Sequence, residues 1–231
     1  MSLDITSNDL VQERSEWNEY WNKKNRGGVL YSLIAEFYRK VIIRPNLNYF
    51  IRKYFKPGSV LLHAGCGSGQ VDQDICKDFK IIGMDISPRA LEIYKETNAT
   101  GETLLSSIFS IQKPDKSLDG IYNLGVMEHF TESQIQQTLV EFRRVLKDNG
   151  HIVLFWPPEF GLSVLFFKFM VKATKIVFRK DVKFHPDEIS RVQSKKDVTA
   201  VLKKGGFDVA EYSFGPKDVF TYSIIVGRKS A

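Results

Sequence analysis

Three glycines at alternate positions, Gly65, Gly67 and Gly69, stand directly after a short apolar run over residues 59–64. Without a Cβ at these positions the backbone can turn sharply, and a ligand can lie against bare main chain. Asp85 follows a second apolar run, twenty residues beyond Gly65. A carboxylate at that place can accept hydrogen bonds from both hydroxyls of a ribose. Together these residues predict a nucleoside site.

The spacing of the glycines separates two kinds of nucleoside cofactor. Loops that bind nicotinamide dinucleotides follow the pattern G-x-G-x-x-G, which seats a pyrophosphate at a helix N-terminus. That pattern would require a glycine at position 70 or 72, where this chain has Gln70 and Asp72. The observed G-x-G-x-G spacing favours a sulfonium nucleoside and disfavours a nicotinamide-dependent oxidoreductase.

Histidines are the candidate acid–base groups outside this loop. His129, preceded by Glu128, could deprotonate a hydroxyl acceptor, because an imidazole titrates near neutral pH. It could equally cap the next helix or pack on a cofactor. His185, which precedes a proline, could be a substrate contact or a surface-loop residue. Cys66 and Cys76 are too few for a disulfide framework, and without clustered histidines they predict no metal site.

An alternation of strand and helix patterns must position these residues. Apolar runs predict strands, and amphipathic periodicity with stop and start signals at Ser87-Pro88 and Asn149-Gly150 predicts helices between them. The expected strands cover residues 59–64, 81–84, 102–106, 120–124, 151–156, 207–214 and 219–226, and the expected helices cover a stretch to about 78, then 88–97, 132–147 and 195–204. This order predicts an α/β fold, a doubly wound and mostly parallel seven-stranded sheet with helices on both faces and a terminal antiparallel hairpin.

Residues 1–54 are expected to form a helical cap that is rich in aromatic side chains. Residues 55–231 are expected to form one further domain, with a helical insert over residues 159–190. Within the cap, Tyr20 and Trp21 are the best candidates to close over a ligand or to grip an acceptor. The alternative for such rings is that they only form the core of the cap.

Four segments resemble the class I S-adenosylmethionine-dependent methyltransferases, of the type that acts on small molecules. They are HAGCGSG at 63–69, MDIS at 84–87, LDGIYNLGVMEHF at 118–130 and EFRRVLKDNGHIVLFWPP at 141–158. The segments occur in the order and spacing of that family, and the resemblance covers roughly residues 55–227. It implies a Rossmann-like fold, S-adenosylmethionine as the cofactor and S-adenosylhomocysteine as the product.

The resemblance also implies a role for each matching position. Asp85 would hold the ribose hydroxyls, and Ile86 would pack on adenine. The methionine and ribose would face four positions of the loop, Gly65, Cys66, Gly67 and Gly69. The floor beneath the methionine would be lined by Asn123, Leu124 and Gly125. Two positions depart from the family. His63 stands where the family usually has an acid, which alters the bracing of the loop. Ser106 and Ser107 stand where it usually has an acid near the adenine amino group, although serine can still hydrogen-bond the adenine edge.

The insert predicts the nature of the acceptor. Within residues 160–180, Lys168, Lys172, Lys175 and Arg179 recur at helical spacing among apolar side chains. Such a helix could lie at a membrane surface, or it could pack over the active site with its lysines in water. Because the family shapes its acceptor pocket there, we expect a small apolar acceptor, either aromatic or lipid-like.

Composition bounds the remaining classes of function. The net charge of +6 over 231 residues is a small excess, and no [DN]-P-P-[YF] motif for a flipped base follows Leu124, so no nucleic-acid partner is expected. The first twenty residues are polar and lysines break the apolar run of the insert, so we expect a cytoplasmic protein, with peripheral membrane contact left open. The alternative to an enzyme is a non-catalytic nucleoside-binding or membrane-docking protein on the same fold.

Overall fold

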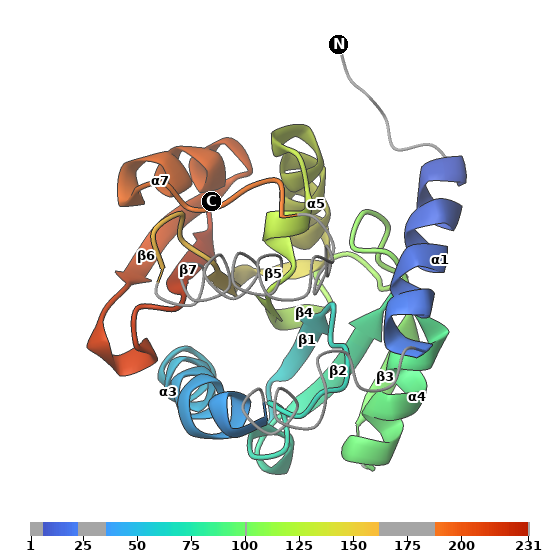
Figure 1. The fold of residues 1–231 in the computed structure, drawn as a ribbon. Helices are drawn as coiled ribbons and strands as arrows, with labels where there is room; N and C mark the ends of the chain where they lie inside the picture. The colour runs from blue at the N-terminus through green and yellow to red at the C-terminus, as the bar shows by residue number, and fades with distance from the viewer. Residues whose placement is uncertain (1–6, 23–35, 100, 162–187, 231) are drawn as a thin grey trace, which may run out of the picture.

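The computed structural model describes residues 7–22, 36–99, 101–161 and 188–230. Its centre is a seven-stranded sheet with the strand order β3-β2-β1-β4-β5-β7-β6 (Figure 1). The strands are β1 (Val60–Ala64), β2 (Lys80–Asp85), β3 (Glu102–Leu105), β4 (Leu118–Leu124), β5 (Leu146–Trp156), β6 (Phe207–Ser213) and β7 (Ser223–Lys229). Strands β1 to β5 are parallel, and β7 runs antiparallel to both β5 and β6. The predicted α/β fold with a terminal antiparallel hairpin is confirmed.

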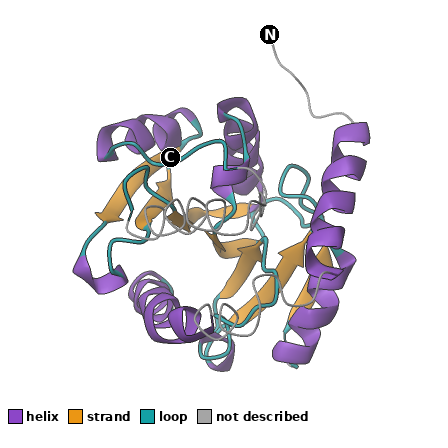
Figure 2. Ribbon diagram, viewed as in Figure 1, coloured by secondary structure: helices purple, strands orange, loops and turns teal. Residues whose placement is uncertain are grey.

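Helices cover both faces of this sheet (Figure 2). The helices α5 (Glu132–Val145) and α7 (Lys195–Lys204) pack on one face, and α3 (Arg44–Tyr54) and α4 (Pro88–Thr97) on the other. Along β1, Leu62 belongs to the core under α5 and α7, whereas its neighbour Leu61 belongs to the core under α3. Successive strand residues point to opposite faces, so one apolar run supplies both cores.

The start of α4 follows its predicted signal. The Ser87 hydroxyl accepts a hydrogen bond from the Ala90 amide at 3.2 Å, and Pro88 occupies the first turn, where its missing N–H is harmless. The N-terminal helix α1 (Ser7–Asn22) lies beside α4 and contacts its first turn (Figure 1). Asn18 Oδ1 accepts hydrogen bonds from the Ser87 hydroxyl at 3.1 Å and from the Arg89 amide at 3.3 Å. The beginning of α4 is therefore held from two sides.

Residues 39–54 contribute to the core on one face of the sheet. A π-helical turn, η1 (Arg39–Ile43), leads directly into α3, whose side chains Leu47, Phe50 and Ile51 are buried. The division of the chain into a cap of residues 1–54 and a domain of residues 55–231 remains a prediction.

The chain after the glycine loop differs from the expected helix. It forms turns followed by a single short 3-10 helix, η2 (Ile75–Lys77), where the sequence predicts a helical stretch to about residue 78. Within this stretch the side chain of Asp72 is fully buried and bonded to groups of the core.

Two strand boundaries also differ from the expectation. Strand β5 begins at Leu146, immediately after α5, and its pairing with β4 contains a bulge, since Leu118 pairs with Leu146 and Gly120 pairs with His151. Strand β7 begins only at Ser223, because the turn η4 (Pro216–Asp218) is followed by two residues in the left-handed region, Val219 and Phe220, with φ of 55° and 54°.

The insert falls mostly outside the described residues. His185 and the basic face over 168–179 lie within residues 162–187, so their predicted roles are not addressed by the structure. In the ranges that are described, no helix combines the length and the apolar character needed to cross a bilayer.

Candidate functional site

The glycine loop and Asp85 meet at the carboxyl ends of β1 and β2. The amides of Gly65 and Cys66 both donate to the carbonyl of Met84, at 2.8 and 2.9 Å, which ties the loop to the end of β2. Asp85 Oδ2 accepts a hydrogen bond from the Gly67 amide at 3.0 Å, and Oδ1 accepts one from the Ser87 amide at 2.9 Å. The two parts of the predicted nucleoside site are therefore in direct contact.

The conformation of this loop requires its glycines. Gly65, Gly67 and Gly69 have φ of 74°, 51° and 64°, a region that side chains with a Cβ rarely occupy. Cys66 is buried between the first two, and its thiol points to the carbonyl of Gly67 at 3.8 Å. The backbone path of this loop is thus one that glycine adopts readily.

Asp85 keeps hydrogen-bonding capacity inside a buried setting. Its side chain is 8% exposed. Burial raises the pKa of Asp85, and the hydrogen bonds from Ser87 and Gly67, together with nearby His63, offset part of that rise. Ile86, the predicted adenine contact, follows as a half-buried residue.

His63 is paired beneath the loop with an acid that the sequence analysis missed. His63 Nδ1 lies 2.8 Å from Asp72 Oδ2, and both side chains are buried. Asp72 also accepts hydrogen bonds from the hydroxyls of Tyr94, at 3.1 Å, and Tyr122, at 2.8 Å. Burial and then the Asp72 carboxylate raise the pKa of both phenols far above the ordinary value, so both stay protonated and donate. The loop is therefore braced by a carboxylate that comes from its own far end.

One aromatic ring supports the back of this loop. A Cβ on Gly69 would run into the ring of Tyr94 and the amide of Asn98, and a Cβ on Gly83 or Gly101 would lie 2.6 or 2.9 Å from the same tyrosine ring. The Asn98 amide donates to the carbonyl of Gly69 at 2.9 Å. Glycine at all three positions is what lets the ring sit there.

Helix α1 covers the front of the loop with aromatic side chains. The ring of Trp21 would be 2.6 Å from a Cβ on Gly67, and Tyr20 packs edge-on against Trp21 with ring centroids 5.3 Å apart. Trp17 packs in the same way on His129, at 5.1 Å. The predicted lid residues lie next to the loop, and His129, the predicted base, contacts this lid. The catalytic role of His129 remains a prediction.

Glu13, also on α1, adds a titratable group to this lid. Its pKa rises to about 7, mainly through burial and secondarily through the charges of Glu16 and Asp85. The lid therefore brings a second carboxyl toward Asp85. Sequence reasoning gave no signal for this group, because an acid in a polar helix looks like a solvated residue.

The end of β4 forms the neighbouring wall. Asn123 is fully buried, and neither its amide oxygen nor its amide nitrogen has a hydrogen-bond partner within the described part of the chain. Leu124 is half-buried, and Gly125 takes a φ of 67° and donates to the Phe155 carbonyl at 3.1 Å. The Val126 side chain would be 2.6 Å from a Cβ on Gly65, so this wall adjoins the glycine loop as the resemblance implies.

Glu128 stands in this wall as a second unassigned acid. It is 4% exposed, and burial raises its pKa to about 8. One carboxylate oxygen, Oε1, would be 3.3 Å from a Cβ on Gly125, and the hydroxyl of Tyr222 would be 3.7 Å from the same point. The signal in the sequence was an acid between Met127 and His129 in an otherwise apolar segment.

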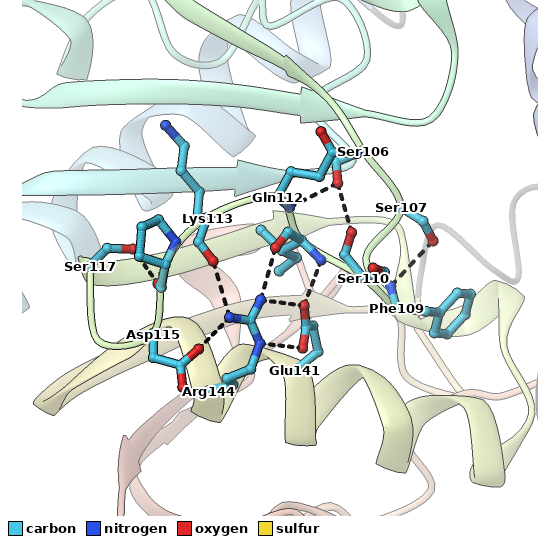
Figure 3. A network of polar contacts seen from close by, with 12 residues as sticks. Ser106, Ser107, Phe109, Ser110, Gln112, Lys113, Asp115, Ser117, Glu141 and Arg144 are labelled. Carbon is cyan, nitrogen blue, oxygen red and sulfur yellow. Dashed lines mark hydrogen bonds and ion pairs between the residues drawn. The ribbon is translucent and has the colours of Figure 1, made fainter.

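The serines at the end of β3 are engaged by their own loop. The Ser106 hydroxyl donates to the Ser110 carbonyl at 2.8 Å and accepts from the Gln112 amide at 3.2 Å, and the Ser107 hydroxyl accepts from the Phe109 amide at 3.2 Å (Figure 3). Their predicted contact with adenine remains a prediction.

A single arginine clamps this loop to α5. The Arg144 guanidinium donates to Glu141, to Asp115 and to the carbonyls of Lys113 and Ile111, the last two at 3.1 and 2.8 Å (Figure 3). Glu141 in turn accepts from the Ile111 amide at 2.6 Å. The segment after β3 is therefore held in one position beside the site.

Comparison with known proteins agrees with this geometry. Residues 62–154 match a family model described as a methyltransferase domain. The chain is 30% identical over 115 residues to demethylmenaquinone methyltransferase of Symbiobacterium thermophilum, a match that covers 46% of this chain and 45% of that protein. An uncharacterized protein of Methanocaldococcus jannaschii is 26% identical over 237 residues, which is 91% of this chain and 86% of that protein. The chain spans about half the length of the first curated relatives that it matches.

A solved structure shares the fold over nearly the whole chain. Magnesium protoporphyrin IX methyltransferase of Synechocystis, with bound S-adenosylhomocysteine, has a TM-score of 0.64 at 16% identity, covering 95% of this chain and 99% of that one. The domain match includes the glycine loop, Asp85 and the whole of β4 and α5. Residues 62–154 therefore match a methyltransferase domain, and the chain shares its fold with a solved methyltransferase.

Proposed function

We propose that this protein transfers the methyl group of S-adenosylmethionine to a small-molecule acceptor and releases S-adenosylhomocysteine. The observation that carries the proposal is the contact between the glycine loop and the Asp85 carboxylate, which joins two groups able to bind one nucleoside. The Asn123 amide is buried beside that loop without a hydrogen-bond partner among the described residues, which also supports a polar ligand there.

The residues divide the work of binding. Asp85 would hold the ribose hydroxyls, the loop from Gly65 to Gly69 would follow the sugar and the methionine, and Asn123 would pair with a polar atom of the methionine end. The cofactor supplies a methyl group that its sulfonium charge already activates. The protein then has to orient the acceptor and exclude water, and α1, whose Trp21 lies on Gly67, is placed for the second task.

We further propose that the acceptor has an apolar body. Trp17 of α1 packs on His129, and the ring of Tyr20 packs on Trp17 at 5.5 Å, so the two rings offer an aromatic surface next to the site. The names of two similar proteins, a demethylmenaquinone and a magnesium protoporphyrin IX methyltransferase, refer to acceptors with large apolar rings. Contact of residues 160–180 with a membrane remains part of this proposal, to be checked by liposome binding of a variant with its lysines neutralised.

Calorimetric titration with S-adenosylmethionine and S-adenosylhomocysteine tests the cofactor. We expect the wild type to bind both, and Asp85→Asn to bind about 100-fold more weakly, because hydrogen bonds to a charged group contribute on the order of 1.5–3 kcal/mol each. Glu92→Gln, which changes an exposed acid on α4, is the matched control and should bind like the wild type. Binding of NAD in place of these ligands would reverse the assignment.

Turnover separates the enzyme from the non-catalytic alternative. A protein that binds S-adenosylmethionine but transfers labelled methyl to none of a broad set of hydroxyl, amine and carbon acceptors would be a nucleoside-binding module. Detection of any methylated product that depends on Asp85 would support the enzyme.

A further inference from the structure

Two buried polar side chains beside the proposed cofactor site have hydrogen-bonding atoms without a partner among the described residues. They are the amide of Asn123, which is fully buried, and Oε2 of Glu128, which is 4% exposed. An unpaired buried polar group costs on the order of 1–3 kcal/mol. Because buried polar groups in native proteins nearly always have a hydrogen-bond partner, the two side chains point to a bound ligand at this place.

The Glu128 carboxyl lies close to the glycine loop. Its Oε1 would be 3.3 Å from a Cβ on Gly125, and the next residue, Val126, contacts the position of a Cβ on Gly65. Only the short segment from Gly125 to Val126 therefore separates the carboxyl from the loop. His129, on the following position of the same 3-10 turn, packs on Trp17 of the lid instead.

The turn that carries Glu128 is anchored through its main chain, and the nearby cation is paired with another acid. Its main-chain carbonyl accepts hydrogen bonds from the amides of Ile189 and Ser190, at 2.6 and 3.0 Å, which anchors the turn. The nearby cation, Arg191, is bonded to Glu188 at 2.7 Å. Burial raises the pKa of Glu128 to about 8, Glu188 adds to the rise and Arg191 opposes it. At neutral pH the carboxyl is thus mostly protonated, and it can both donate and accept a hydrogen bond.

We propose that Glu128 binds the hydroxyl group of the methyl acceptor. A neutral carboxyl and a hydroxyl pair reciprocally, because each can donate to the other and accept from it. An ammonium group would instead require an ionised carboxylate, which the apolar surroundings disfavour. The acceptor class is therefore an alcohol or phenol on an apolar body. This inference rests on the proposed function, since it takes the glycine loop as the cofactor site.

The test uses small probes on the protein saturated with S-adenosylhomocysteine. The probes are 4-propylphenol, propylbenzene, which lacks the hydroxyl, and 4-propylaniline, which carries an amine. We expect 4-propylphenol to bind at least about tenfold more tightly than propylbenzene, the effect of one good hydrogen bond in a buried site. In Glu128→Leu the two should bind within about twofold of each other. Glu128→Gln should keep part of the preference, because an amide can also donate and accept.

The controls separate this inference from the proposed function. Glu132→Gln, an exposed acid on α5, should keep the wild-type preference. If the wild type does not bind S-adenosylhomocysteine, the proposed function itself is refuted. If that ligand binds, the inference alone is overturned by an undiminished phenol preference in both Glu128 variants. It is also overturned if the wild type binds no phenol or prefers the aniline. It is overturned as well if Glu128→Gln raises the Kd for S-adenosylhomocysteine more than about tenfold. The last would assign the carboxyl to the methionine ammonium.

Discussion

His63 Nδ1 lies 2.8 Å from Asp72 Oδ2, inside the protein and beneath the glycine loop. The family usually has an acid at the position of His63, and here the acid comes from the far end of the loop instead. The amide of Asp72 also donates to the Gly69 carbonyl at 3.0 Å, so the residue supports the loop through both its side chain and its main chain. The exchange keeps a negative charge behind the loop while changing the strand residue to an imidazole.

This pairing predicts a strong dependence between the two positions. His63→Asp should place two carboxylates in contact in the core and lower the free energy of unfolding by about 3 kcal/mol or more. Adding Asp72→Asn should recover at least half of that loss, since it removes the repulsion. Urea denaturation of the two single variants and the double variant measures the coupling. Additive losses would show that the two side chains act independently.

Glu128 predicts a pH-dependent stability. Its pKa rises from 4.5 to about 8 in the folded protein, so between these pH values the folded state holds a proton that the unfolded state releases. Stability from this group is then complete below pH 4.5 and is lost as the pH rises through 8, by up to about 1.4 kcal/mol per pH unit.

The variant Glu128→Gln isolates this effect. It should unfold like the wild type at pH 5 and be more stable at pH 8, because it has no proton to lose while Glu188, Arg191 and Tyr222 around it are unchanged. Urea midpoints at pH 5, 6.5 and 8 provide the measurement. A constant difference between the two proteins across this range would contradict the assignment.

Trp21 predicts a role for the lid in cofactor retention. Its ring lies on Gly67, so Trp21→Ala should expose the bound nucleoside to water and raise the Kd of S-adenosylhomocysteine about tenfold. Tyr49→Ala, which removes an exposed ring on α3, is the matched control. Titration calorimetry gives both values. Tighter binding by Trp21→Ala would mean that the ring competes with the nucleoside.

We expect Arg144 to stabilise the loop after β3 in a way that a lysine cannot replace. Arg144→Lys keeps the charge but loses the fork that reaches Glu141, Asp115 and two carbonyls together, and should cost about 2 kcal/mol of stability. Hydrogen exchange over residues 106–117 should rise in the same variant. Arg143→Lys, at the exposed neighbouring position, should change neither quantity. Equal effects of the two substitutions would rule out the clamp.

Local signals predicted most of the fold. The alternating apolar runs gave each strand of the sheet, and Ser87-Pro88 gave the start of α4, because a cap depends only on neighbouring residues. The contact of Asp85 with the glycine loop could also be predicted, since the carboxyl ends of neighbouring parallel strands share one edge.

What failed to appear in the sequence depends on distant partners. The burial of Asp72 could not be predicted from its neighbours in the chain, because its partners Tyr94 and Tyr122 come from separate elements. Glu128 was noted beside His129, but its raised pKa could not be predicted, because such a shift comes from the packing around a carboxyl and not from its neighbours in the chain.

The ring of Tyr94 fills the space left by three missing side chains, at Gly69, Gly83 and Gly101. These positions come from the loop, from β2 and from the approach to β3, yet each would meet the same atoms if it gained a methyl group. For protein engineering they form a single mutational unit: a designer who wants a bulkier residue at any one of them must first shrink the tyrosine, and in doing so gives up a hydrogen bond to Asp72.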